Sequence, residues 1–208
     1  MTNPENTVAI PGLLQNKILK KVVFTPGGLT IKRPMSFGRG IFIRDENIAA
    51  FRFGIKQLYC AGFEFGSQYF IEVRDFKNEI FRIQLNSYFG IRKKIYYHVW
   101  ADLLQTFWDH YIDHQLNYYI ELYNMQMSFE LAGVTFYPDG ISFDKSNKLR
   151  WNEIAIKSYQ NYFMIHHNKD SRIYKCCLFS IEWNAVILQS LLKEIIKEYD
   201  KVSKSSSF

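Results

Sequence analysis

The sequence predicts an α+β, mostly β protein that contains two copies of one structural unit. Residues 69–82 and 162–175 match each other without a gap, at a constant offset of 93. Residues 24–30 likewise match residues 136–142, and both stretches contain a Pro-x-Gly turn. In each copy a helical pattern follows the strand patterns. We therefore expect two sets of antiparallel strands, each closed by a C-terminal helix.

The composition is typical of packed cores rather than of disorder. Hydrophobic residues make up 48% and aromatic residues 17% of the 208 residues, and aromatic side chains favour pleated sheets. The chain lacks an apolar run of the roughly 20 residues that cross a bilayer. Its first residues also lack the basic and apolar regions of an export signal. We therefore expect a cytoplasmic protein without a transmembrane segment.

The first copy is expected to span residues 17–125, after a loosely ordered arm at residues 1–16. The arm shows no hydrophobic period. From Lys20 on, apolar residues alternate around the turn Pro26-Gly27-Gly28, which is typical of a hairpin with one buried face. Further strands are indicated at residues 41–43, 49–53, 69–73 and 80–85.

A long helix is predicted at the end of the first copy, at about residues 93–124. Apolar and aromatic residues recur there at steps of three and four, from Tyr96 to Tyr123, which is the spacing of one helix face. Such a helix is about 45 Å long and is unusually long for the end of one small unit. A break near residues 113–115 also fits the pattern.

The second copy is expected at residues 126–200, followed by a flexible tail at residues 201–208. Its closing helix carries apolar residues from Ile181 to Ile196. The tail is rich in Ser and Lys, which indicates a solvated segment. Six strands are indicated in this copy, at residues 129–136, 141–143, 149–151, 154–159, 162–166 and 173–178.

The three cysteines, Cys60, Cys176 and Cys177, do not form a disulfide framework pattern. Cys176 and Cys177 are adjacent on an expected strand, where their side chains point to opposite faces. The sequence has no C-x-x-C motif and no pair of one Cys and one His at zinc-ligand spacing. Free thiols in a reducing cytosol are therefore expected.

The order of the elements resembles that of a pleckstrin-homology-like (PH-like) domain, in which short antiparallel strands precede one amphipathic helix. The second copy is most similar to the bacterial PH-like domains. The residues that carry the resemblance are Phe136-x-Pro138-Asp139-Gly140-Ile141, Leu149-x-Trp151-x-Glu153-Ile154 and Tyr162-Phe163-Met164-Ile165. The first copy departs from the pattern, because Asp45 stands in place of Trp151 and extra residues lie between Phe53 and Tyr69.

The resemblance implies two PH-like antiparallel barrels, each made of two orthogonal sheets with the helix over one open corner. It also implies a binding or scaffold module, because PH-like domains are not generally enzymes. In lipid-binding members, basic residues around the first two strands hold an inositol phosphate. The basic residues of the first copy in that region are Lys20, Lys21, Lys32, Arg33 and Arg39, whereas the second copy has only Lys145 and Lys148.

Positive charge is concentrated in the first copy. Residues 1–94 hold 15 Lys and Arg against 7 Asp and Glu, whereas residues 95–125 hold 4 acidic residues and no basic ones. Such a field attracts anionic partners, and it also keeps a protein soluble. The candidate anion-binding residues are Lys32, Arg33, Arg39, Arg92, Lys93 and Lys94.

The sequence shows no catalytic signature, so we expect neither enzyme activity nor a cofactor. It has no nucleophile with an identifiable base and no glycine-rich phosphate loop before a helix. His110 and His114 lie four residues apart on the expected helix, a spacing that can place two imidazoles on one metal ion. Histidines on a helix surface are far commoner than such metal sites.

The expected function is that of a non-enzymatic binding or scaffold protein that acts through protein–protein contacts of tandem PH-like units. Strand edges and loops are the expected contact sites, and an unknown protein is the expected partner. The first alternative is that the basic first copy binds an anionic ligand, a membrane surface with anionic lipid, or nucleic acid. The second alternative is a metal-assisted enzyme centred on His110 and His114.

Overall fold

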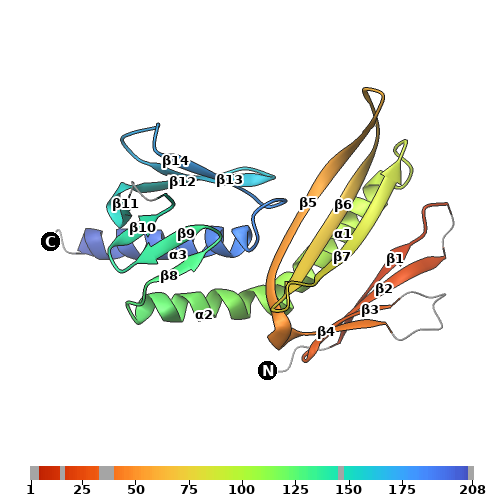
Figure 1. The fold of residues 1–208 in the computed structure, drawn as a ribbon, viewed down its shortest axis with the longest axis horizontal. Helices are drawn as coiled ribbons and strands as arrows, with labels where there is room; N and C mark the ends of the chain where they lie inside the picture. The colour runs from red at the N-terminus through yellow and green to blue at the C-terminus, as the bar shows by residue number, and fades with distance from the viewer. Residues whose placement is uncertain (1–4, 15–16, 33–39, 145–147, 206–208) are drawn as a thin grey trace. The chain divides into compact units, whose positions relative to one another are not determined.

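The computed structural model describes residues 5–14, 17–32, 40–144 and 148–205. The described chain is mostly β with additional helices, which confirms the α+β, mostly β class (Figure 1). Its strands form four antiparallel sheets. The chain divides into two compact units, Met1–Asp113 and His114–Phe208. Each unit holds one four-stranded and one three-stranded sheet.

The first sheet of unit 1 is a four-stranded antiparallel meander with the order β1-β2-β3-β4. Its strands are β1 (Asn6–Pro11), β2 (Ile18–Thr25), β3 (Gly28–Lys32) and β4 (Ile41–Arg44). The loosely ordered arm expected at residues 1–16 is therefore wrong for residues 6–11. β1 is held by its pairing with β2, from Asn6 opposite Phe24 to Pro11 opposite Ile18. A local hydrophobic period does not reveal such pairing.

A 3-10 segment, η1 (Asp45–Asn47), separates this sheet from the second sheet of unit 1. The second sheet has the order β5-β6-β7. Its strands are β5 (Ile48–Cys60), β6 (Phe63–Asp75) and β7 (Ile80–Tyr88). β5 and β6 pair as far as Cys60 opposite Phe63, whereas β7 pairs with β6 only as far as Tyr88 opposite Gly66. The β5–β6 hairpin therefore extends beyond β7, as Figure 1 shows.

The core of unit 1 forms where α1 (Lys93–Phe107) packs against both sheets. The ring of Phe107 meets Phe24 of the first sheet edge to face at 5.3 Å, and it stacks with Phe51 of the second sheet at 6.3 Å. The indole N–H of Trp100 donates to the carbonyl oxygen of Phe70 at 3.1 Å. These contacts join the two sheets into one apolar interior.

The helix expected at about residues 93–124 is divided into three segments. α1 is followed by η2 (Trp108–Ile112), a π-helical segment, and then by α2 (Asp113–Asn124). The φ and ψ angles of Phe107 and Asp113, on either side of η2, are α-helical, so η2 is a widened turn within one continuous helix and lies just before the alternative break predicted near residues 113–115. The boundary between the units follows Asp113 and so precedes the boundary expected after residue 125, because most of α2 belongs to unit 2.

Unit 2 has a second four-stranded sheet, in the order β8-β9-β10-β11, and a three-stranded sheet, in the order β12-β13-β14. The last helix extends to Ser205, into the tail expected at residues 201–208. The elements after α2 are β8 (Phe129–Leu131), β9 (Val134–Tyr137), β10 (Gly140–Ser142), β11 (Lys148–Arg150), η3 (Trp151–Glu153), β12 (Ile154–Ser158), β13 (Tyr162–His167), β14 (Tyr174–Leu178) and α3 (Ala185–Ser205).

Matched glycines of the two units occupy the same register positions. Gly28 pairs with Arg44 across β3 and β4, and Gly140 pairs with Arg150 across β10 and β11. At each glycine an added Cβ would collide with a carbonyl oxygen of the partner strand. Both positions therefore require glycine for close approach of the two backbones.

Neither unit forms a closed barrel in the described part of the chain, so the expected antiparallel barrels are wrong. β1 and β4 are the edges of the first sheet of unit 1, and β5 and β7 are the edges of the second. The 3-10 segments η1 and η3 interrupt the backbone pairing between the sheets of each unit. Each unit consists of two open sheets with an associated helix.

Candidate functional site

Three connections meet at one end of unit 1, which we call the open end. The Nε of Arg92, in the β7–α1 connection, donates to the carbonyl oxygen of Leu13 in the β1–β2 connection at 2.9 Å. The N–H of Phe89 donates to the carbonyl oxygen of Phe65, near the tip of the β5–β6 hairpin, at 2.7 Å. The open end comprises residues 11–14, 17–21, 32, 58–65 and 88–95.

Two lysines of the open end stand face to face on neighbouring strands. Lys21 of β2 is directly opposite Lys32 of β3, and both side chains are exposed. Like charges directly opposite each other destabilise an antiparallel pair. An anion between the two ammonium groups would convert this repulsion into attraction. The first sheet therefore offers an anion a site with two positive charges.

The start of α1 places more positive charge at the open end. Lys93 and Lys94 form the first turn of α1 and are exposed. Cations are unfavourable there, because the N-terminus of a helix carries a partial positive charge. Arg92 precedes them with φ of 58°, and its guanidinium has no acceptor with which to cap the helix N–H groups. An anion bound there would compensate the charges of Lys93 and Lys94 and would accept the helix N–H groups that Arg92 does not cap.

The structure brings together most of the predicted anion-binding residues. Those at the open end are Lys32, Arg92, Lys93 and Lys94. Arg33 and Arg39 lie outside the described residues. Sequence reasoning missed Lys17, and it named Lys20 and Lys21 only through the family resemblance. The strand pairing that unites these lysines is the signal that a single stretch of sequence lacks.

Exposed apolar side chains lie among these basic residues, and the sequence patterns did not single out Leu14, Tyr59 or Phe63. The exposed fractions are 65% for Tyr59, 78% for Phe63 and 81% for Phe89. Leu14 is 80% exposed in the β1–β2 connection. The exposure of Tyr59 and Phe63 depends on how far β5 and β6 extend past β7, which no single stretch of sequence shows.

The two ends of unit 1 differ in charge. Within the described part of the open end, Glu64 is the only acidic residue among seven basic ones. The opposite end contains η1 and the β6–β7 turn. It carries the acidic residues Asp45, Glu46, Asp75 and Glu79 and the basic residues Arg44, Arg74 and Lys77. Unit 1 therefore presents the open end as its positive pole.

The matching place in unit 2 is a polar, partly acidic depression. Gly133 and Asp144 stand where unit 1 has Lys21 and Lys32, by extension of the match between residues 24–30 and 136–142. The depression is lined by Glu130, Gly133, Thr135, Tyr137, Ser142, Phe143 and Asp144. The basic pair is therefore specific to unit 1.

An ion triad with a buried carboxylate at its centre crosses the second sheet of unit 1. Glu72 is only 1% exposed and stands opposite Arg52 on β5 and Arg82 on β7. Its Oε2 accepts from the Nε of Arg52 at 2.6 Å, and its Oε1 forms an ion pair with Arg82. Because both carboxylate oxygens are engaged, Glu72 links strands rather than acting as a general base.

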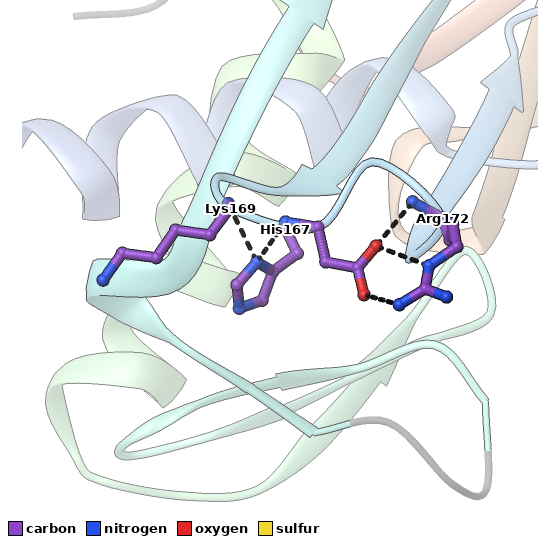
Figure 2. Close-up of polar contacts among 4 residues, drawn as sticks. His167, Lys169 and Arg172 are labelled. Carbon is purple, nitrogen blue, oxygen red and sulfur yellow. Dashed lines mark hydrogen bonds and ion pairs between the residues drawn. The ribbon is translucent and has the colours of Figure 1, made fainter.

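A polar cluster in unit 2 shapes the β13–β14 turn (Figure 2). The Nδ1 of His167 accepts the backbone N–H groups of Lys169 and Asp170, both at 3.0 Å. The carboxylate of Asp170 in turn accepts from the Nε and Nη2 of Arg172, at 3.0 and 2.9 Å. The cluster bonds its own turn, which is a structural role.

His110 and His114 differ in environment, which weakens the hypothesis that they share a metal ion. His110 is buried in η2, and its Nδ1 lies 3.0 Å from the carbonyl oxygen of Thr106. Its ring also packs against Phe24, at 5.6 Å between centroids. His114, on α2, is exposed. Packing and a backbone contact account for the position of His110.

Comparison of the sequence with protein-family models gives no match, and comparison with curated proteins also gives none. Among the described residues, no helix combines the length and apolar character needed to span a membrane. The same residues contain no group of three or more His, Cys, Asp or Glu placed to hold a metal ion.

Proposed function

We propose that the chain is a non-enzymatic binding protein built from two PH-like units. The order of elements supports this. In each unit a four-stranded antiparallel meander leads through a 3-10 corner into a three-stranded sheet. A long helix, α1 or α3, then follows. Such a unit presents loops and sheet edges to partners, and binding at these surfaces needs no enclosed catalytic pocket.

The open end of unit 1 is the proposed binding site, and its partner is anionic. The observation that carries this proposal is the direct opposition of Lys21 and Lys32 on β2 and β3. Folding brings these charges together against their mutual repulsion, and Lys93 and Lys94 add charge where the helix disfavours it. A bound anion turns each of these local penalties into a favourable interaction.

The residues that precede α1 and α3 differ in charge, although both helices start with the same backbone conformation. Where Arg92 precedes α1 with φ of 58°, Asn184 precedes α3 with φ of 60°. Asn adopts this conformation more readily than Arg. Unit 2 thus forms the same helix start without positive charge, so the helix start itself does not require a basic residue, and in unit 1 the Nε of Arg92 holds the β1–β2 connection through Leu13.

Binding of a polyanion, such as heparin, tests this proposal. We expect the double variant Lys32→Glu/Lys94→Glu to bind the polyanion about 25-fold more weakly, because the loss of each contact reduces affinity by about fivefold. Binding of the unchanged protein should weaken steeply between about 0.1 and about 1 M salt. Lys77→Glu, an exposed substitution at the opposite end, is the matched control. Equal losses in the control and the double variant contradict a site at the open end.

A protein partner is the second candidate, and the β4 edge favours it. β4 is the outer strand of its sheet, and its residues Ile41 and Phe42 are 47% and 53% exposed. An extended peptide can add to such an edge, with main-chain hydrogen bonds for affinity and exposed side chains for specificity.

Site-specific crosslinking distinguishes this candidate. A photoreactive residue at position 42 should form adducts with a protein partner, and Ile41→Asp should abolish them. The same group at position 76, in the β6–β7 turn, is the control. Adducts of equal yield at both positions argue against strand addition at β4.

A further inference from the structure

We propose that the open end docks on the surface of an anionic lipid bilayer, with Tyr59, Phe63 and Phe89 inserted between the headgroups. This inference rests on the proposed function, in which unit 1 binds an anionic partner, and it identifies that partner as a lipid bilayer. It follows from the tip of the β5–β6 hairpin, from the β7–α1 connection beside it, and from the charge around both.

The tip of the hairpin holds its aromatic side chains on an ordered backbone. Cys60 pairs with Phe63 across the turn formed by Ala61 and Gly62, whose φ values are 48° and 85°. Two positive φ values are typical of the tight turns that match the twist of a hairpin. Tyr59 and Phe63 are thus presented to solvent by a paired backbone, and little further ordering is needed on binding.

Phe89 is exposed by an unusual backbone conformation. Its φ is 50°, which is rare for a bulky residue. Its N–H donates to Phe65, whose ring stacks on Tyr88 at 5.9 Å and lies 6.3 Å from the ring of Phe89. Burial therefore does not explain this conformation, since the ring remains 81% exposed. Strained residues of this kind cluster at functional sites.

Aliphatic side chains favour a bilayer over nucleic acid as the partner. Leu14, Ile91 and Ile95 are exposed beside the aromatic residues. A single-stranded nucleic acid is bound by aromatic stacking and positive charge, which leaves aliphatic side chains in water. A bilayer interface buries aliphatic and aromatic side chains together, and aromatic rings favour the headgroup region.

The charges around the tip complement an anionic bilayer. Lys93 and Lys94 follow Ile91 at the start of α1, and Lys21 and Lys32 lie on the first sheet of the same end. Each lysine close to an anionic surface strengthens binding by about fivefold. Because acidic residues predominate at the opposite end, the field of unit 1 turns the open end toward the membrane.

Cys60 provides a reporter at the tip itself. It is exposed and lies directly opposite Phe63. Cys176 is also exposed, so the Cys176→Ser variant directs a polarity-sensitive fluorophore to Cys60. The Cys60→Ser variant, labelled at Cys176 in unit 2, is the matched control.

The experiment compares neutral phosphatidylcholine vesicles with vesicles that contain about 30 mol% phosphatidylserine. We expect the full chain to cosediment with the anionic vesicles only, and the fluorophore at Cys60, but not at Cys176, to shift to shorter wavelength. Phe63→Ser with Phe89→Ser should reduce vesicle affinity by at least about tenfold, because burial of each ring contributes at least this much when complete. Phe76→Ser, at an equally exposed phenylalanine of the opposite end, should leave it unchanged.

The outcomes separate this inference from the proposed function. Vesicle binding that the Phe63 and Phe89 substitutions leave intact, without a spectral shift at Cys60, overturns insertion and keeps an electrostatic site. Binding to heparin or oligo-dT but not to anionic vesicles also overturns it and makes a polyanion or nucleic acid the partner. If none of these probes binds, the proposed function itself fails. Circular dichroism of each variant confirms that it is folded.

Discussion

Lys21 and Lys32 stand directly opposite each other on β2 and β3, at the end of unit 1 where positive charge gathers. In an isolated sheet, two like charges in this arrangement repel and weaken the strand pair. The arrangement gives a direct test of whether the charges serve the fold.

Exchange of one of these charges should stabilise the protein. Lys21→Glu or Lys32→Glu creates an opposite-charge pair and is expected to raise the free energy of unfolding by about 0.2–1 kcal/mol. The double exchange restores a like-charge pair and should remove this gain. Urea denaturation of all four forms measures the coupling. Additive stabilisation in the double variant would show that the side chains do not interact.

Charge reversal at the start of α1 is expected to act in the same direction. Lys93→Glu and Lys94→Glu place negative charge in the first helical turn, which should raise the free energy of unfolding by about 0.3–1 kcal/mol each. The same variants should lose affinity for anionic vesicles. Thermal unfolding at low and high salt measures the gain, which salt should reduce. If a variant loses both stability and affinity for vesicles, unfolding explains the loss of binding.

Removal of the buried charge at Glu72, in the ion triad of the second sheet, should destabilise the protein. Glu72→Gln leaves the partly buried Arg52 and the exposed Arg82 without their shared carboxylate. We expect the free energy of unfolding to fall by about 1–3 kcal/mol. Glu79→Gln, at an exposed position of the β6–β7 turn, is the control and should stay within about 0.5 kcal/mol. Similar changes at both positions would remove any special role for Glu72.

Local patterns in the sequence predicted most of the strands, because alternating apolar residues and Pro-Gly turns are short-range signals. The pairing of β1 with β2 depends on contacts between different segments, and residues 6–11 carry no clear period of their own. The π-helical turn η2 lies before residues 113–115, where the sequence allowed a break as an alternative. Whether a barrel closes depends on backbone pairing across the 3-10 segments η1 and η3. The positions of the strands in the sequence do not show this pairing.

The charged half of the candidate site was predictable, whereas Tyr59 and Phe63 of its aromatic half were not. Lys32, Arg92, Lys93 and Lys94 follow from counting charge along the chain. The exposure of Phe63 depends on β5 and β6 extending past the end of β7, which is a tertiary property. The sequence places Phe89 close to Arg92, Lys93 and Lys94, whereas its positive φ shows only in the folded backbone.

Thiol reactivity should distinguish the three cysteines. Burial raises the pKa of Cys177 to about 12, so its thiol stays protonated and shielded at neutral pH, whereas Cys60 and Cys176 are exposed. We expect two thiols to react quickly with a disulfide reagent in the folded protein and the third only after unfolding. Mass spectrometry of the labelled peptides identifies them. Rapid labelling of Cys177 in the folded state would contradict its burial.

The β13–β14 turn should respond to acid below the usual range for a carboxylate. The hydrogen bonds from Arg172 lower the pKa of Asp170 from 3.8 to about 2. Because the folded-state pKa is the lower one, the stabilisation is fully present above about pH 4 and is lost as the pH falls through about 2. An NMR titration of the Asp170 carboxyl carbon measures the midpoint. In Arg172→Ala the midpoint should rise toward 3.8, because the carboxylate loses its guanidinium partner. An unchanged midpoint would mean that the bonds drawn in Figure 2 do not hold Asp170 in solution.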